Sequence, residues 1–304
     1  MSVQQQTSIQ EATQTAADEP SDILEGLLHY QLFTEAERVR WRMEDIPWSN
    51  IDRSKVTASS LALVRTIAFA ELTTYAATRR FLQEFSDDID FTQWMSVWFY
   101  EETKHPQALI RWLHEFGEKF SAGEMVRGRI TAPFMKSRFG MLVTNVISEV
   151  NASAGYTVLY RMFKEPVLKQ VVRHLGGDEA RHATGFFAYA RRAFERSKRV
   201  DEDRLEALKV LHMWLGHNTS VQHPVNTVGL RTSNDRHILD EWSQAASDAT
   251  ILEQQSVLQQ RITRERSLAL VGNLIGINLK TPEEVMQHIT ELTPKNRKST
   301  VQSH

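Results

Sequence analysis

Two Glu-x-x-His strings, at residues 102–105 and 179–182, carry the clearest chemical signal in the chain. Residues three apart in a helix lie on one face about one turn apart, so each glutamate and its histidine can bind the same ion. A single string of this kind arises readily by chance in a chain of 304 residues, and one alone would mean little. The residues around the two strings distinguish them from chance occurrences.

A lone glutamate precedes each string at nearly the same distance. Glu71 lies 31 residues before Glu102, and Glu149 lies 30 residues before Glu179, each in an otherwise apolar stretch with helical periodicity. A pair of helices that carries Glu and then Glu-x-x-His therefore occurs twice. This repeat predicts four helices that direct four carboxylates and two imidazoles inward as metal ligands, namely Glu71, Glu102, His105, Glu149, Glu179 and His182.

The charge of this set indicates what it would hold. Four buried carboxylates without a counter-charge would each cost several kcal/mol, because burial removes the hydration of an ion. Two divalent cations would neutralise them. Oxygen and imidazole ligands without a thiolate suit iron or manganese, and known di-iron and di-manganese helical bundles use this ligand set. We therefore predict two iron ions as the cofactor, with manganese as an alternative.

The elements that must position these residues are helices. Apolar residues recur at three- and four-residue spacing from Ser21 onward, which predicts an all-α fold: a four-helix bundle with additional flanking helices. We expect a disordered N-terminal tail at 1–20, one helical domain at 21–293 and a polar C-terminal tail at 294–304. The expected helices cover residues 22–44, 57–85, 91–117, 137–163, 166–197, 203–220, 235–272 and 281–292.

Composition excludes several classes of protein. The 36 Lys and Arg residues against 38 Asp and Glu give a net charge of −2, which favours neither nucleic acid nor an anionic membrane as a partner. The absence of cysteine rules out disulfides, thiolate-bound zinc, cysteine-ligated iron–sulfur clusters and a thiol nucleophile. Neither a signal peptide nor a membrane-spanning run is visible, so we expect a cytoplasmic protein.

Two motifs resemble those of the ferritin-like di-iron superfamily, and most closely the soluble acyl-acyl-carrier-protein desaturases. Residues 94–105 are similar to the desaturase pattern Trp-x-x-x-Trp-x-x-Glu-Glu-x-x-His, and residues 178–182 to Asp-Glu-x-Arg-His. The resemblance covers residues 57 to 197. It implies a ferritin-like bundle, O2 as co-substrate, a homodimer, an external electron donor of the ferredoxin or flavin reductase type, and a substrate carried on acyl carrier protein.

Acidic residues directly before the two strings suggest an outer set of contacts. Metal-bound histidines usually donate their second ring N–H to a carboxylate, and we expect Asp178 to serve His105 and Glu101 to serve His182. The resemblance further implies a path from Trp41 through Asp178 to His105. Trp98 is expected to pack near the site, and Ser153 stands near the position of a pocket hydroxyl in related hydroxylases.

The reaction remains open at this stage. Leu109 replaces the radical tyrosine of ribonucleotide reductase, Leu175 replaces the additional histidine of the arylamine N-oxygenases, and Ala152 replaces a desaturase threonine. We expect an O2-dependent oxidase that desaturates or hydroxylates an acyl or similar apolar substrate. The alternatives are an N-oxygenase or hydroxylase of a small metabolite, and an iron-handling protein without an organic substrate.

Overall fold

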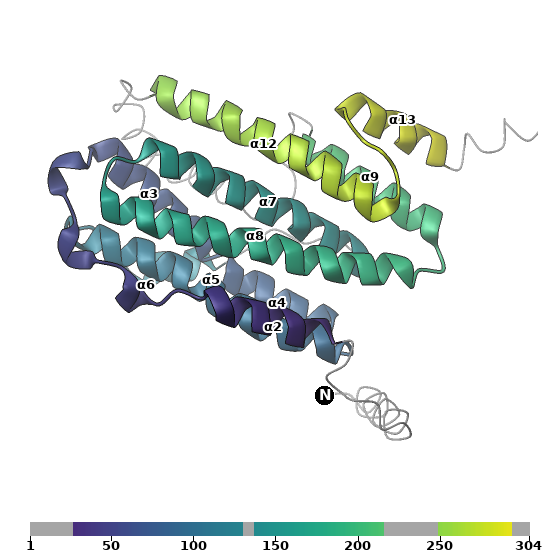
Figure 1. Cartoon of the computed structure of the whole chain (residues 1–304), viewed down its shortest axis with the longest axis horizontal. Helices are drawn as coiled ribbons and strands as arrows, with labels where there is room; N and C mark the ends of the chain where they lie inside the picture. The colour runs from purple at the N-terminus through teal and green to yellow at the C-terminus, as the bar shows by residue number, and fades with distance from the viewer. Residues whose placement is uncertain (1–26, 130–136, 216–248, 294–304) are drawn as a thin grey trace, which may run out of the picture.

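The computed structural model describes residues 27–129, 137–215 and 249–293, and every regular element in these ranges is helical (Figure 1). Three short 3-10 turns lie between residues 43 and 55. The α-helices are α2 (Leu28–Val39), α3 (Ala58–Glu71), α4 (Thr74–Glu84), α5 (Ile89–His114), α6 (Ala122–Gly128), α7 (Arg138–Met162), α8 (Pro166–Glu195), α9 (Val200–Leu215), α12 (Ala249–Ile275) and α13 (Pro282–Leu292).

The central bundle has four members, with α3 and α4 acting together as the first and α5, α7 and α8 as the others. The helices α7 and α8 pack along each other, and α5 contacts α3, α4 and α8. On one side α12 lies against α7, with α9 and α13 beside it, and on the opposite side α2 lies against α5 (Figure 1). The predicted all-α bundle with flanking helices is confirmed.

Capping residues explain where the bundle helices begin. Asp88 accepts a hydrogen bond from the N–H of Phe91 at the start of α5, and Ser137 does the same at the start of α7. The Glu165 carboxylate caps α8, whose first residue is Pro166, a residue with no N–H to satisfy. The predicted helix starts near residues 91, 137 and 166 agree with the observed first residues, Ile89, Arg138 and Pro166, to within two residues.

The expected single helix at 57–85 is divided at Leu72 and Thr73. The N–H groups of these residues bond to carbonyls three positions back, at 3.3 Å for Leu72 and 3.1 Å for Thr73. Such bonds tighten the backbone locally toward 3-10 geometry, and mid-helix 3-10 segments often accompany functional positions. Glu71 is the last residue of α3 and therefore lies at this break.

The remaining differences between the expected and the observed helices concern the ends of helices and one short additional helix. The expected helix at 22–44 appears as α2, which ends at Val39 because Arg40 turns into extended backbone. The seven-residue helix α6 was not expected, although Ser121 and Glu124 form a capping box at its start. The predicted tails 1–20 and 294–304, and parts of the helices expected at 203–220 and 235–272, lie outside the described residues.

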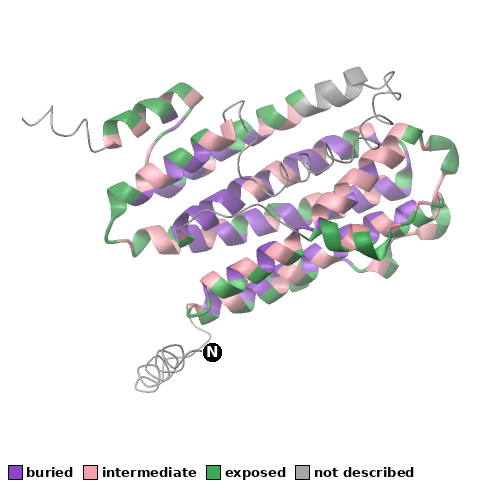
Figure 2. Cartoon of the chain, turned by 180° about the vertical axis from the view of Figure 1, so that it is seen from behind, coloured by how far each residue is buried: buried purple, intermediate pink, exposed green. Residues whose placement is uncertain are grey.

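Buried residues lie on the facing sides of the bundle helices (Figure 2). They form two apolar clusters. One contains Trp98 and Phe186, and the other contains Leu109 and Leu175. Along α5 and α8, the Glu-x-x-His strings lie between the members of these clusters, so the bundle has a polar layer between two apolar layers. None of the described helices has a stretch long and apolar enough to span a membrane.

Candidate metal centre

The six predicted ligands come together in the polar layer. They form two groups, each with ligand atoms within 4.8 Å of one another, and all but Glu71 are classed as buried. Glu102 and Glu179 belong to both groups, in the manner of carboxylates that bridge two ions. The first group is Glu71, Glu102, His105 and Glu179, and the second is Glu102, Glu149, Glu179 and His182.

The environment of His105 provides a test of whether a metal ion fits. Its Nδ1 is buried and has no hydrogen-bond partner of acceptable geometry among the described residues. Nevertheless, oxygens of Glu179, Glu71 and Glu102 lie 3.2, 3.5 and 3.8 Å from it. A nitrogen surrounded by carboxylate oxygens without a linear hydrogen bond is the arrangement that a shared cation would satisfy. The donor set therefore fits a metal ion at this position.

In the second group, carboxylate oxygens surround His182 as they surround His105 in the first. The Nδ1 of His182 lies 2.9 Å from Glu102, 3.4 Å from Glu179 and 4.0 Å from Glu149. The centroids of the His105 and His182 rings are 5.9 Å apart, and the ring planes differ by 27°. Two similar half-sites thus face each other across the shared carboxylates, which makes the cluster able to bind two metal ions.

Side chains from neighbouring helices orient three of the four carboxylates. Thr74 donates its hydroxyl proton to Glu102 at 2.9 Å, and the Trp98 indole N–H donates to Glu149 at 3.2 Å. The buried Tyr156 hydroxyl donates to Glu71. Because each bond joins two helices, the bundle packing itself determines the direction in which the carboxylates point.

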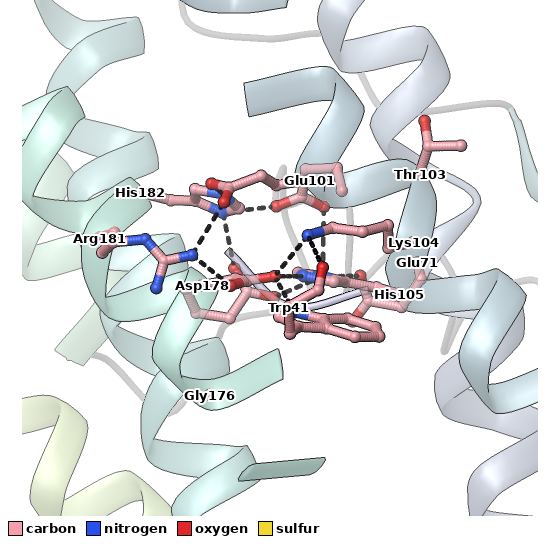
Figure 3. Close-up of polar contacts among 12 residues, drawn as sticks. Trp41, Glu71, Glu101, Thr103, Lys104, His105, Gly176, Asp178, Arg181 and His182 are labelled. Atoms are coloured by element: carbon pink, nitrogen blue, oxygen red, sulfur yellow. Dashed lines mark hydrogen bonds and ion pairs between the residues drawn. The ribbon is translucent and has the colours of Figure 1, made fainter. Parts of the chain in front are cut away.

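The outer nitrogens of both histidines contact a carboxylate of the other Glu-x-x-His helix. His105 Nε2 lies 3.2 Å from Asp178, and His182 Nε2 lies 3.1 Å from Glu101. Arg181 joins the two carboxylates, because its Nη2 donates to Glu101 at 2.9 Å and also to Asp178 (Figure 3). The arrangement expected for Glu101 and Asp178 is present, and it leaves both Nδ1 atoms facing the carboxylate cluster.

A further contact extends from Asp178 toward the molecular surface. The Trp41 indole N–H donates to Asp178 at 2.8 Å, so Trp41, Asp178 and His105 form a continuous hydrogen-bonded path (Figure 3). The Lys104 ammonium lies 3.8 Å from Asp178 and 4.6 Å from the centroid of the Trp41 ring. The path lies on the His105 side of the cluster.

The electrostatics set Glu102 and Glu149 apart from the carboxylates that are held ionised by the histidines. Burial and the charge of Glu179 raise the pKa of Glu149 well above its usual value, and the same causes raise the pKa of Glu102 to about 7. For Asp178 and Glu101, burial would also raise the pKa, but the neighbouring histidines outweigh it and lower the pKa. The pKa of the inner Glu179 is likewise lowered, because the charge and hydrogen bonds of His105 and His182 outweigh its burial. Asp178, Glu101 and Glu179 are therefore ionised at neutral pH, whereas Glu102 and Glu149 need added positive charge to ionise fully.

The two predicted pocket residues, Ser153 and Trp98, differ in whether they contact the cluster. Ser153 donates its hydroxyl proton to the backbone carbonyl of Gly176, across the α7–α8 interface, so its expected role beside the metals stays a prediction. Trp98 contacts the site directly through Glu149, and its ring lies 6.2 Å from that of His182. The hydrogen bonds from Thr74, Tyr156 and Arg181 to the carboxylates were not predicted from the sequence.

Comparison with known proteins supports this fold. Neither the models of known protein families nor the curated proteins give a match to the sequence. Among solved structures, the chain is similar to R2-like ligand-binding oxidases. The one from Sulfolobus acidocaldarius has 14% identity and a TM-score of 0.53, and the match covers 86% of this chain and 94% of that one.

Two point mutants of an R2-like ligand-binding oxidase give comparable matches. The first, with an anaerobically reconstituted Mn/Fe cofactor, has 15% identity and a TM-score of 0.51 over 80% of this chain and 94% of that one. The second, with a non-activated Mn/Mn cofactor, has 16% identity and a TM-score of 0.50 over 80% and 93%. At these identities the likeness establishes the fold, which is the ferritin-like helical bundle.

Proposed function

We propose that this protein is an O2-dependent oxidase with two iron ions, or manganese in place of iron, held by the six inner side chains. The observation that carries the proposal is that two overlapping groups of buried carboxylates and imidazoles share Glu102 and Glu179. The R2-like oxidases of the same fold carry Mn/Fe or Mn/Mn cofactors, which supports the same use of the site here.

Reduced metal ions bound at such a site would supply electrons to O2, and the O2 activated in this way would supply the oxidising power for attack on a C–H bond. The protein provides the surroundings. The two apolar layers on either side of the cluster limit the access of water, and the bonds from Asp178 and Glu101 hold the histidine rings in place. Such control of hydration and orientation is the main contribution of a protein to cofactor chemistry.

An acyl or similar apolar compound is the substrate that we propose. The side chains next to the inner ligands are apolar on both sides, with Trp98 and Phe186 toward one end of the bundle and Leu109 and Leu175 toward the other. Desaturation or hydroxylation of a chain carried on acyl carrier protein is the reaction favoured by the desaturase-like motifs. An external donor supplies the electrons.

Substrate and activity can be tested together. The full-length protein is loaded anaerobically with Fe(II), with Mn(II) or with both, metal content is measured, and O2 is added in the presence of a panel of substrates. The panel contains acyl carrier protein thioesters, free fatty acids and small amines. We expect two metal ions per chain, O2 consumption, and an acyl product that has lost two hydrogens or gained one oxygen, detected by mass spectrometry.

A matched pair of variants provides the control. Glu179→Ala removes a shared ligand and is expected to abolish O2 consumption, whereas Glu44→Gln changes an exposed acid and leaves the activity unchanged. Oxidation of an amine would favour the small-metabolite enzyme, and O2 consumption with iron uptake but without any organic product would favour an iron-handling protein. Failure of the wild-type chain to bind a transition metal would refute the proposal.

A further inference from the structure

A surface cavity of about 580 Å3 lies at the outer end of the Trp41–Asp178–His105 path. It is bounded by the end of α2 and the segment that follows it, by the end of α7 and by α8 from Pro166 to Arg181. Tyr160 of α7 also lines it, with its ring centroid 4.5 Å from the Lys169 ammonium. Its volume is within the range of about 300–1,000 Å3 that is typical of small-molecule sites. The lining residues that matter for its chemistry are Trp41, Lys169, Arg173, His174, Asp178 and Arg181.

The charge of this cavity suits an anion. Lys169 and Arg173 line it on α8, Lys169 half-buried and Arg173 exposed. Among the described residues that line the cavity, Asp178 is the acid, but it is 1% exposed and paired with Arg181. Arg181 is itself paired with Asp178 and Glu101. Lys169 and Arg173 are therefore the cations that can meet a phosphate.

The cavity also has an aromatic wall. The rings of Trp41 and His174 are stacked, with centroids 5.2 Å apart and planes within 20°. Trp41 is 3% exposed, so a ligand would contact its edge and the partly exposed His174 ring. A planar ring system with an attached phosphate would match both features, since aromatic side chains stack on flat rings and cations pair with phosphates.

The position of the cavity gives this ligand a role. Two hydrogen bonds, of 2.8 and 3.2 Å, lead from Trp41 through Asp178 to His105, whose other ring nitrogen faces the candidate metal ligands. In the other half-site, Glu101 accepts hydrogen bonds from His182 and Arg181, and within the described residues no tryptophan donates to it. The cluster thus has a connection to the surface on its His105 side.

We propose that this cavity binds reduced flavin mononucleotide as a diffusible electron donor, with its ring against Trp41 and His174 and its phosphate at Lys169 and Arg173. The proposal rests on the proposed function, because it names the donor for the same metal pair. One reduced flavin releases two electrons and two protons and leaves as oxidised flavin. The electrons reduce two ferric ions to ferrous ions, and the protons pass to water at the mouth of the cavity.

Binding is tested first, and separately from activity. The affinity of FMN for the metal-free and metal-loaded protein is measured by quenching of flavin fluorescence, with riboflavin as the ligand that lacks the phosphate. We expect FMN to bind more tightly than riboflavin. The double variant Lys169→Gln/Arg173→Gln is expected to weaken FMN binding by about tenfold or more while leaving riboflavin binding within about twofold.

A matched double variant controls for the loss of positive charge. Lys198→Gln/Arg199→Gln removes two exposed cations after the far end of α8, roughly 30 Å along the helix from Arg173. FMN affinity is expected to stay at the wild-type value in this variant. Absence of FMN binding, or equal losses in the two double variants, would overturn the proposal.

Electron transfer is tested by anaerobic stopped-flow mixing of the oxidised, metal-loaded protein with reduced FMN, and in parallel with dithionite. The cavity double variant is expected to slow reduction by FMN at sub-saturating concentration by about the factor lost in binding. Reduction by dithionite should be unchanged. If FMN does not bind while the dithionite-reduced protein consumes O2, the flavin site is refuted and the oxidase stands. If the dithionite-reduced protein consumes no O2, the oxidase is refuted, and FMN binding to metal-free protein still tests the cavity.

Discussion

The Glu101 carboxylate on α5 lies 3.1 Å from Nε2 of His182 on α8, and this contact joins the two Glu-x-x-His helices on the outer side of the cluster. Asp178 and His105 form the reciprocal contact at 3.2 Å. Each helix therefore supplies the carboxylate that fixes the histidine of the other. A change in the packing of one helix alters the ligand geometry in both half-sites.

Removal of the negative charge from either outer carboxylate should weaken metal binding. We expect Glu101→Gln and Asp178→Asn each to lower the affinity for Fe(II) or Mn(II) by about 10- to 100-fold, because the histidine loses the partner that fixes its tautomer and raises its basicity. Competition titration with a chelating dye measures the affinity. The exposed Glu44→Gln variant serves as the control, and affinities equal to that control would contradict the role assigned to these carboxylates.

The shared position of two carboxylates predicts different metal stoichiometries. Glu102 and Glu179 belong to both groups of ligands, whereas Glu71 and Glu149 belong to one group each. We expect Glu179→Ala or Glu102→Ala to reduce the binding of both ions, and Glu71→Ala or Glu149→Ala to leave one ion bound. Elemental analysis after removal of loosely bound metal gives the count. Loss of a single ion in all four variants would rule out bridging by Glu102 and Glu179.

The buried Asp90 should make folding stability depend on pH. Burial would raise its pKa, but hydrogen bonds from the backbone and ring of His29 and from Arg192 outweigh burial and lower the pKa. A carboxylate with a lowered pKa in the folded state stabilises the protein above its unfolded pKa of about 3.9, and this stability is lost as the pH falls through the folded value.

We therefore expect Asp90→Asn to reduce the free energy of unfolding by about 2–4 kcal/mol at neutral pH, and the difference from wild type to shrink as the pH is lowered toward about 3. Urea denaturation at several pH values measures this difference. Asp87→Asn is the control, because Asp87 pairs with Arg138 at the surface and its side chain is 69% exposed. A deficit for Asp90→Asn that is the same at every pH would show that charge is not its cause.

Two glycines of α8 should respond in opposite directions to alanine. A Cβ at Gly185 would lie 2.8 Å from Cε2 of the buried Trp94 and closer still to Cζ2 of the same ring, whereas a Cβ at Gly177 would have its nearest neighbour, an Arg181 nitrogen, at 3.9 Å. We expect Gly185→Ala to destabilise the protein by about 1–3 kcal/mol through overpacking. Gly177→Ala should stabilise it by up to about 1 kcal/mol. Equal effects on the unfolding midpoint would contradict this packing argument.

The sequence was sufficient to predict the ligand cluster because helical geometry is regular. Spacings of 31 and 30 residues place Glu71 and Glu149 on the helices preceding those of Glu102 and Glu179, and the apolar faces turn all four inward. The contacts of Thr74 and Tyr156 were missed because they depend on how neighbouring helices are rotated. Tyr156 lies seven positions after Glu149, hence on the same helix face, which was a usable signal.

The break between α3 and α4 was not predictable from periodicity, since the apolar pattern continues through it. Residues 72 and 73 stay in the right-handed helical region, with ψ of −17° and −25°, and their hydrogen bonds change from the α to the 3-10 pattern. A contact between two helices accounts for the position of the break. Thr74, directly after the break, bonds to Glu102, so the backbone adjusts at the point where the first bundle helix reaches the carboxylate cluster.

Because of this break, the four candidate carboxylate ligands differ in how easily they can be displaced. Glu149 and Glu179 belong to uninterrupted helical turns, and displacing either would disturb backbone bonds on both sides. Glu102 also lies inside a helix, although Pro106, four residues later, has no N–H to donate to its carbonyl. Glu71 ends its helix, and its side chain retains 13% exposure. Rotation of the Glu71 carboxylate is therefore expected to be the least costly rearrangement in the cluster, and with metal ions bound it would be the ligand that could move aside to admit an incoming molecule.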